Sequence, residues 1–337
     1  MSTQLISIGM PVYNGGEFLR RAIEGLLAQT HTHFELIISD NASTDEMTRE
    51  ITEEFARRDS RIRLTRQPVN LGALANFIWV TEQARGEYFM WAAHDDFWSP
   101  NYLEVLARRL DENPDAILAT PLTQVETTFR NGNTEQEFIP AAPNRDLDAT
   151  LDVYIEHFKA CLWLYGLYRT PWIKQVAPEW KRYPLLSGDV IWLWGVLLTE
   201  RVVGDENATF YYTADHRARR RLTYRQTVQM WGIDGNHMTR LSWQKSPADQ
   251  RLRNVLKAWK YVYLHHLRRK NVFRTSTRIV KLSLLWCWIG VETAVRGLFG
   301  LNSQSIRCRA LTEPPKEKIP FGTPSTVDPQ QETLNAA

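Results

Sequence analysis

The stretch Tyr88–Asp96, YFMWAAHDD, joins an aromatic and apolar run to two adjacent carboxylates. Residues 88–93 predict a buried strand, because the run leaves no position for a solvated side chain. Asp95 and Asp96 then follow the carboxyl end of that strand, where open α/β sheets place their ligand crevice. The stretch therefore predicts an α/β sheet with charged groups at its ligand-binding edge.

Strand and helix patterns alternate on both sides of this stretch. Strands are predicted over residues 5–13, 34–39, 62–65, 88–93 and 116–119. Helices are predicted over residues 18–27, 73–85 and 102–110, with a charged helix that ends near residue 57. Because about ten to fifteen helical residues separate successive strands, we expect parallel strands joined by right-handed crossovers. The fold class is predicted to be α/β, with a doubly wound, mostly parallel sheet.

The sequence changes character after Val125. Residues 129–150 are polar and contain Pro140 and Pro143, which predicts a long mobile loop. Residues 151–215 regain apolar segments and are expected to complete the same core. We predict a main domain over residues 1–225, in halves 1–125 and 126–225, a basic helical extension over 226–310 and a disordered tail over 311–337.

The net charge of the 337-residue chain is only +3, but the charge is unevenly distributed. Residues 251–300 contain eleven Lys or Arg residues and a single acid, Glu292, which indicates an acidic partner for this region. Within it, Leu282–Leu301 is apolar, yet Glu292 and Arg296 would each cost about 2.5–3.5 kcal/mol at a membrane centre. We therefore expect either an interfacial helix on an anionic membrane surface or a helix packed on the main domain.

The three cysteines, Cys161, Cys287 and Cys308, are odd in number and lack metal-ligand spacing. This pattern argues against a disulfide framework and fits a reducing compartment. The first residues, Met1–Gln4, lack a basic segment before the apolar run, so no signal peptide is expected. A cytoplasmic location follows, either free or on the inner face of the membrane.

Asp95 and Asp96 have two competing interpretations. Adjacent carboxylates repel each other unless a cation or a proton relieves the repulsion. Mg²⁺ is commonly held by one or two carboxylates together with substrate phosphates, and Mn²⁺ accepts similar ligands. The first interpretation is therefore a site for a divalent cation and a diphosphate. The second is that both acids cap the helix whose first turn contains Pro100.

Polar residues also follow the second and third predicted strands, at residues 40–45 and 70–72. A carboxylate can accept a hydrogen bond from an imide N–H, and an amide both donates and accepts, so these residues could bind a heterocycle or a ribose. The alternative is turn chemistry, because Asp, Asn, Ser and Gly favour turns for backbone reasons alone. Their joint position at strand ends favours a binding site.

Four motifs stand together in a recognisable order: Pro11–Asn14, Asp40–Asp45, Asn70–Gly72 with Asn76, and Ala93–Asp96 followed by Pro100. In order and spacing they resemble those of the large family 2 of inverting glycosyltransferases, which have the GT-A fold. The resemblance is dense over about residues 5–115. It implies a nucleotide-sugar donor and a divalent cation, Mg²⁺ or Mn²⁺.

The same resemblance implies roles for individual residues. Pro11, Tyr13 and Asn14 would line the pocket for the base, and Asp40 would hold the base. Asn70, Gly72 and Asn76 would belong to the same donor site. Asp95 lies at the position of the family's metal-binding acid and Asp96 follows it. Ala93 departs from the pattern, since many members carry the first acid of an Asp-x-Asp motif there.

The family also places a catalytic base downstream, often in a Glu-Asp pair that opens a helix. Asp189 matches it, with Gly188 at the position of the Glu. Independently, an acid just before the apolar run Val190–Trp194 would be partly desolvated, which raises its pKa toward that of a useful base. The alternative is that Asp189 only caps that helix.

The resemblance thus implies an inverting, hexosyltransferase-type enzyme of surface polysaccharide or glycolipid assembly, whose acceptor would be a glycan or a lipid-linked molecule. Loops around residues 129–150 and 205–225 would set the sugar and the acceptor. The alternative is a catalytically weak sugar-nucleotide-binding protein, suggested by Ala93. No Gly-x-Gly-x-x-Gly follows the first strand, which argues against a dinucleotide oxidoreductase. No nucleic-acid partner is expected, because no recognition motif accompanies the basic region.

Overall fold

The computed structural model describes a set of residues that ends at Asp215. These residues are 4–129, 131–144, 149–150, 153–154, 157–182, 192–193, 196–197 and 200–215. The predicted basic extension and tail lie outside the described residues, as does Asp189. Among the described residues, no helix combines the length and apolar character needed to cross a bilayer.

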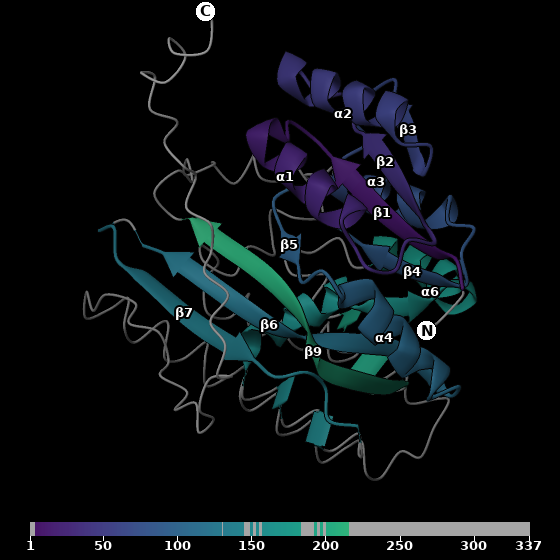
Figure 1. Ribbon diagram of the computed structural model, residues 1–337, viewed down its shortest axis with the longest axis vertical. Helices are drawn as coiled ribbons and strands as arrows, with labels where there is room; N and C mark the ends of the chain where they lie inside the picture. Colours follow the sequence, from purple (N-terminus) through teal and green to yellow (C-terminus); the bar gives the residue numbers. More distant parts are fainter. Residues whose placement is uncertain are drawn as a thin grey trace, which may run out of the picture. The chain divides into compact units, whose positions relative to one another are not determined.

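The first part of the chain alternates strands and helices as the sequence predicts (Figure 1). Its elements are β1 (Ile6–Val12), α1 (Gly16–Leu27), β2 (Phe34–Asp40), α2 (Glu46–Arg58), β3 (Ile62–Arg66), α3 (Ala73–Glu82) and β4 (Tyr88–Trp91). Strand β1 pairs in parallel with both β2 and β4, and β2 pairs in parallel with β3. The predicted parallel sheet is confirmed.

The second part of the described chain continues the same sheet. Its elements are β5 (Phe97–Trp98), α4 (Tyr102–Asp111), β6 (Ala116–Thr128), β7 (Thr134–Ile139), η1 (Phe158–Tyr165), β8 (Leu167–Arg169), α6 (Thr170–Val176), η2 (Ala177–Arg182) and β9 (Arg201–Asp215). The strand order is β3-β2-β1-β4-β8-β6-β9-β5, with β7 paired to β6. Because β8 is antiparallel to both β4 and β6, strands β1–β4, β6 and β9 all run in one direction.

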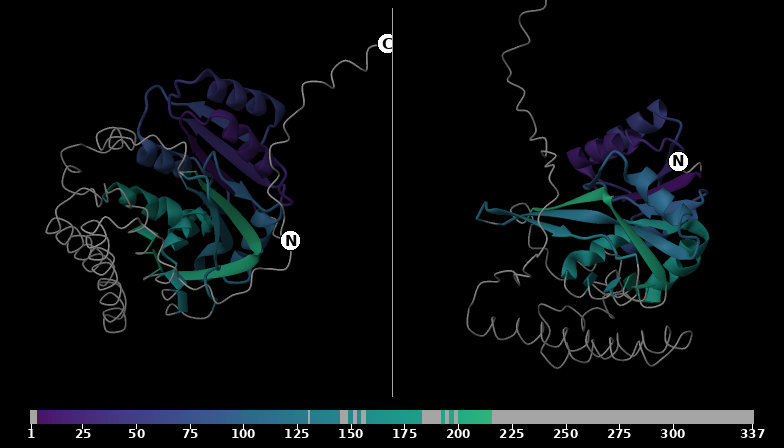
Figure 2. Two further views of the ribbon diagram at one scale, coloured as in Figure 1. Left: turned by 90° about the vertical axis from the view of Figure 1, so that its left-hand side faces the viewer. Right: turned by 60° about the horizontal axis from the view of Figure 1, so that its bottom comes forward.

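The prediction of a long loop over residues 129–150 is wrong at residues 134–139. Strands β6 and β7 form an antiparallel hairpin, with Thr128 opposite Thr134 and Thr123 opposite Ile139. The expected loop from residue 205 is also part of a strand as far as Asp215, since β9 pairs with β6 on both sides of an irregularity at residues 206–208. Figure 2 shows β6, β7 and β9 running side by side. Polar composition concealed β7, because its first four residues are polar and much of the strand is exposed.

The two faces of the sheet bury separate apolar clusters. On one face α1 places Leu19, Ile23 and Leu26, at helical spacing, against the strands, and α2 and α4 complete that layer. The other face packs α3, α6, η1 and η2 around Trp91, whose ring centroid lies 5.3 Å from that of Phe89. Alternate residues of β4 therefore point into different clusters, as the period of two in a strand requires.

Candidate functional site

The carboxyl ends of the parallel strands meet at one edge of the sheet. Val12 lies opposite Asp40 at the ends of β1 and β2, and the Asn41 amide donates to the Val12 carbonyl at 2.8 Å. On the other side of β1, the Ala92 amide donates to the Gly9 carbonyl at 2.9 Å. The loops that follow β1, β2 and β4 therefore gather at this edge, as the sequence predicts.

The turn after β1 is held by the turn after β2. Asn14 has a φ of 52°, and its amide donates to Ser43 Oγ at 2.9 Å, while its Oδ1 accepts from the Thr44 amide at 2.8 Å. Pro11 is buried and Tyr13 is 37% exposed. Of the three residues predicted to line the base pocket, Tyr13 offers a free side-chain surface and Asn14 is committed to joining the two loops.

Asp40 ends β2 with its carboxylate buried and fixed from two directions. Its Oδ1 accepts from the Ser43 amide at 2.9 Å, and its Oδ2 accepts from Arg66 Nη1 at 2.5 Å. Arg66 also donates to the Ser43 carbonyl at 2.8 Å, and its side chain is 45% exposed. Arg66 is not among the predicted site residues, because the predicted third strand ends at Thr65. One residue more brings Arg66 opposite Asp40 in the sheet.

The side-chain amides of Asn70 and Asn76 form hydrogen bonds within the protein. Asn70 Oδ1 accepts from Asn41 Nδ2 at 2.9 Å and from the Gly72 amide at 2.8 Å. Asn76 donates to the Ser39 carbonyl at 3.0 Å and is 2% exposed. Gly72 has a φ of 83°, a left-handed conformation that favours glycine, at the start of α3. These three residues hold the loops around Asp40 in place.

The two acids after β4 differ in exposure. Asp95 is exposed, whereas Asp96 is 2% exposed. The helix-cap interpretation of this pair is wrong, because α4 begins at Tyr102 with Asn101 as its N-cap and β5 separates it from the acids. His94 lies against the turn after β1, with its Cδ2 3.2 Å from where a Cβ on Gly15 would stand.

Asp96 is buried without compensation. Its Oδ2 has no hydrogen-bond partner among the described residues. Burial and, to a lesser extent, the charge of Asp95 raise the pKa of Asp96 well above its ordinary value. Burial and the nearby Asp96 also raise the pKa of Tyr102, whose hydroxyl donates to the Tyr165 carbonyl at 2.9 Å.

The pair Asp95 and Asp96 fits a hard divalent cation. A cation would relieve the repulsion between them and give the orphaned Oδ2 a partner. No group of three or more His, Cys, Asp or Glu side chains forms a metal cage within the described part of the chain. A pair of carboxylates suits Mg²⁺ or Mn²⁺, because these ions commonly take one or two carboxylates and complete their coordination with water and substrate phosphates.

Comparison with known proteins gives this edge a context. Residues 7–165 match the family model described as Glycosyl transferase family 2. This region is a family 2 glycosyltransferase domain. The match includes the strands and loops that carry Pro11, Asp40, Asp95 and Asp96.

Two curated relatives and one solved structure illustrate the similarity. Glycosyltransferase GlyG of Streptococcus pneumoniae serotype 4 is 34% identical over 110 residues, which are 33% of this chain and 36% of GlyG. The putative teichuronic acid biosynthesis glycosyltransferase TuaG of Bacillus subtilis is 29% identical over 147 residues, 44% of this chain and 57% of TuaG. The alignments thus span only 36% to 57% of these relatives' own length.

The crystal structure of S. aureus TarS 1–349 superposes with a TM-score of 0.59 at 16% identity, covering 90% of this chain and 76% of that one. At this identity the likeness concerns the fold. It confirms the predicted GT-A architecture.

Proposed function

We propose that this protein transfers a sugar from a nucleoside-diphosphate donor to an acceptor hydroxyl in the assembly of a surface polysaccharide or a glycolipid. The observation that carries the proposal is that the buried Asp40 lies at the same edge of a family 2 domain as Asp95 and Asp96. The name of TuaG supports a polysaccharide pathway. TarS has been solved with UDP-GlcNAc, which makes UDP-sugars the first donors to test.

Asp40 and Arg66 are suited to reading the base of the donor. A carboxylate has about four lone-pair sites, so the bonds from Ser43 and Arg66 leave Asp40 able to accept an imide N–H. The exposed part of the Arg66 guanidinium offers donors to a neighbouring carbonyl of the base. Tyr13 directly follows Val12, which lies opposite Asp40, and its side chain is 37% exposed, so its ring is available to a base.

Asp95 and Asp96 would hold the divalent cation. When bound, it would neutralise the negative charge that develops on the leaving diphosphate. The exposed Asp95 can reach a ligand directly, and Asp96 supplies a second carboxylate fixed by burial. Ala93 contributes no carboxylate, so this pair would provide the acids of the motif.

We assign the catalytic base to Asp189. The acceptor hydroxyl attacks the anomeric carbon from the face opposite the diphosphate, and Asp189 takes the hydroxyl proton as the new bond forms. The bond to the diphosphate breaks on the other face, so the configuration inverts. A single carboxylate suffices as base, because the leaving group departs as a stabilised anion and needs no proton.

The experiment is to compare the wild-type protein with Asp189→Asn. A thermal-shift screen with UDP-, GDP- and dTDP-sugars, with and without Mn²⁺, first identifies the donor. The variant should bind that donor with unchanged affinity and lose sugar transfer, because it keeps the shape of the residue and loses the base. Near-normal turnover by Asp189→Asn would contradict the assignment.

A second function, sugar-nucleotide binding with little or no transfer, is favoured by Ala93 alone. The Ala93→Asp variant separates the two proposals. If the wild-type protein binds the donor and transfers no sugar, while the variant gains transfer, the binding function is supported. Transfer by the wild-type protein at rates typical of enzymes, about 1 s⁻¹ or more, would exclude it.

We place the reaction at the cytoplasmic face of a membrane, where the basic segment 251–281 would meet anionic lipid headgroups. Flotation of the full chain with vesicles that contain anionic lipid tests this placement. A truncation at residue 250 should remain unbound. Failure of the full chain to float with the vesicles would rule the placement out.

A further inference from the structure

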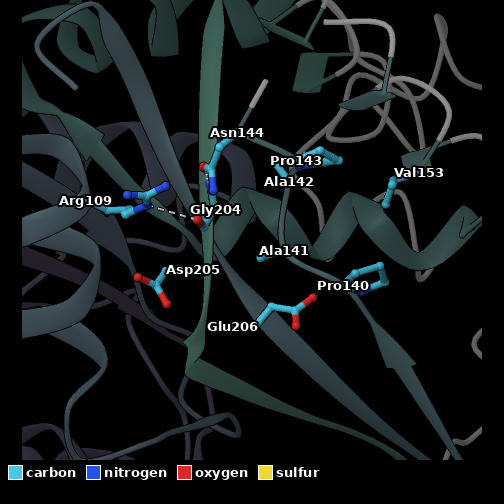
Figure 3. Close-up of a pocket in the computed structure, with 10 residues that line it drawn as sticks. All are labelled: Arg109, Pro140, Ala141, Ala142, Pro143, Asn144, Val153, Gly204, Asp205 and Glu206. Atoms are coloured by element: carbon cyan, nitrogen blue, oxygen red, sulfur yellow. Dashed lines mark hydrogen bonds between the residues drawn. The ribbon is translucent and has the colours of Figure 1, made fainter. Parts of the chain in front are cut away.

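A pocket of about 420 Å³ lies apart from the predicted donor site. It is formed between α4, the segment after β7 and the start of β9, and none of the predicted site residues lines it. Figure 3 shows Pro140, Ala141 and Val153 on one side of it and Asp205 and Glu206 on the other. Its volume falls within the range of about 300–1,000 Å³ that is usual for small-molecule sites.

The walls of the pocket are fixed by hydrogen bonds to the sheet. Asn144 Oδ1 accepts from the Gly204 amide at 2.9 Å, and Thr120 Oγ1 accepts from the Ala142 amide at 2.8 Å. Arg109 Nε donates to the Gly204 carbonyl at 3.2 Å. A Cβ on Gly204 would stand 2.5 Å from the main chain of Ala142, so glycine is required for this close approach. The pocket is therefore preformed.

The charged side chains that line the pocket differ in whether they already have hydrogen-bond or ion-pair partners. Arg109 is occupied by Glu112, at 2.8 Å, as well as by Gly204. Asp205 Oδ1 accepts from both nitrogens of Asn207, and Asp205 Oδ2 lies 3.6 Å from Arg108. Glu206 is exposed and makes no hydrogen bond or ion pair within the described part of the chain. The free group is thus a carboxylate that can accept hydrogen bonds and would repel anions.

This combination matches the chemistry of an uncharged sugar. A pyranose offers hydroxyl donors to a carboxylate, and its C–H face packs on apolar surfaces such as Pro140, Ala141 and Val153. An anionic sugar would be repelled by Glu206, and the two arginines of the described residues near it, Arg108 and Arg109, are already paired with Asp205 and Glu112.

Hydrogen bonds also join the β9 side of the pocket to the segment that follows Asp95 and Asp96. Asn207 follows Glu206 and its carbonyl accepts from Asn101 Nδ2 at 3.1 Å. Two residues further, the Thr209 amide donates to Ser99 Oγ at 3.0 Å. Ser99 and Asn101 lie in the segment that runs from Asp96 into α4. A ligand in the pocket would therefore contact a part of β9 that is hydrogen-bonded to the segment following Asp96.

We propose that this pocket binds an uncharged sugar unit of the growing glycan acceptor, away from the hydroxyl that reacts. The role in acceptor binding rests on the proposed transferase function, but the binding itself does not. The pocket would retain the polymer between additions by engaging a sugar already in the chain.

The test is a methyl NMR titration of the full chain labelled at alanine and valine methyl groups. The ligands are two neutral oligosaccharides, maltotetraose and cellotetraose, and an anionic one, tetragalacturonate. A neutral probe should shift the methyl signals of Ala141, Ala142 and Val153. Glu206→Ala should weaken that binding at least about fivefold, as expected for loss of one hydrogen bond to a charged group. The matched control is Glu135→Ala, an exposed acid on β7, which should leave it unchanged.

Three results would overturn the proposal: no shift at these methyl groups with either neutral probe, binding unaffected by Glu206→Ala, or equal binding of the anionic probe. A parallel titration with UDP, followed at the methyl groups of Ala42 and Ala93, reports on the donor site. Shifts at the pocket without any response to UDP would count against the donor proposal alone. Shifts with UDP and none at the pocket would count against the pocket proposal alone.

Discussion

Glu35 and Asp96 are both buried carboxylates, but they lie at opposite ends of the parallel strands and have opposite surroundings. Glu35 is at the amino end of β2, where Oε1 accepts from Ser7 Oγ at 2.7 Å and from the Arg85 amide at 2.8 Å. Its Oε2 accepts from Arg63 Nη1 at 2.6 Å. Asp96 follows the carboxyl end of β4, and its Oδ2 has no partner among the described residues.

The pKa values of the two acids move in opposite directions for this reason. Burial alone would raise the pKa of Glu35, but the hydrogen bonds from Ser7, Arg63 and Arg85 outweigh it and hold the pKa below its ordinary value. For Asp96, burial and the charge of Asp95 act together and raise the pKa. A carboxylate whose oxygens both accept hydrogen bonds from the protein stabilises the fold. A carboxylate with an oxygen that accepts none, beside a second carboxylate, is available to a ligand.

The largest effect is expected at the ligand end. Asp95→Asn should lower the turnover number for sugar transfer at least about 100-fold, because a metal-held diphosphate contributes several kcal/mol to the transition state. The free energy of unfolding should stay within about 0.5 kcal/mol of the wild type, since Asp95 is exposed. Steady-state kinetics and urea unfolding measure the two quantities.

The control for that variant is Glu50→Gln, an exposed acid on α2 that should leave both quantities unchanged. Equal activity of Asp95→Asn and Glu50→Gln would remove Asp95 from the site.

At the opposite end, Glu35→Ala should destabilise the fold by about 2–3 kcal/mol. The change leaves Arg63, Ser7 and the Arg85 amide without their acceptor, and breaking a buried ion pair costs about 3–5 kcal/mol before the partial exposure of Arg63 is considered. Urea unfolding at neutral pH measures the loss. A change below about 0.5 kcal/mol would show that the network is dispensable.

The same network predicts a pH dependence. Because the folded-state pKa of Glu35 lies below its ordinary value of 4.5, its stabilisation is present above that pH and is lost as the pH falls through the folded-state pKa. The difference in unfolding free energy between the wild type and Glu35→Gln should therefore shrink in acid. A difference that is independent of pH between neutral and acid conditions would contradict the assignment.

A smaller effect of opposite sign is expected for Asp96→Asn. Asp96 is buried, its Oδ2 has no hydrogen-bond partner among the residues that the structure describes, and the charge of Asp95 acts on it, so removing its charge should raise the free energy of unfolding by about 1 kcal/mol. Sugar transfer should fall at the same time, because one acid of the cation site is lost. If the variant is less stable than the wild type, Asp96 has a structural partner and the contrast with Glu35 fails.

The smallest effect is expected for Arg66→Ala. The Arg66 side chain is 45% exposed, so the loss of its pairing with Asp40 is screened by solvent and should cost less than about 1 kcal/mol in stability. Donor affinity should weaken about three- to fivefold, since Asp40 loses one of its two fixed contacts. Arg57→Ala on α2, whose Arg is 70% exposed, is the control, and calorimetry with the donor identified by thermal shift compares the two variants.

Much of the fold could be predicted because the signals were local. The apolar spacing of α1 and the apolar run of β4 each report on the burial of a single element, and the alternation of such elements specifies a parallel sheet. Strand β7 and the part of β9 from Asp205 onward escaped prediction, because residues 134–137 and 205–207 are polar and give no apolar pattern.

For the site, too, the positions of the residues could be predicted, whereas their surroundings could not. The sequence by itself determined which polar residues end the strands, among them Asp40, Asp95 and Asp96, because the order of elements along the chain places them there. Only the tertiary structure decided the surroundings: Arg66 lies beside Asp40, Asn76 is bonded to Ser39, and Asp96 Oδ2 has no hydrogen-bond partner within the described part of the chain. Hydrogen bonds and burial join residues distant in sequence, so no local pattern records them.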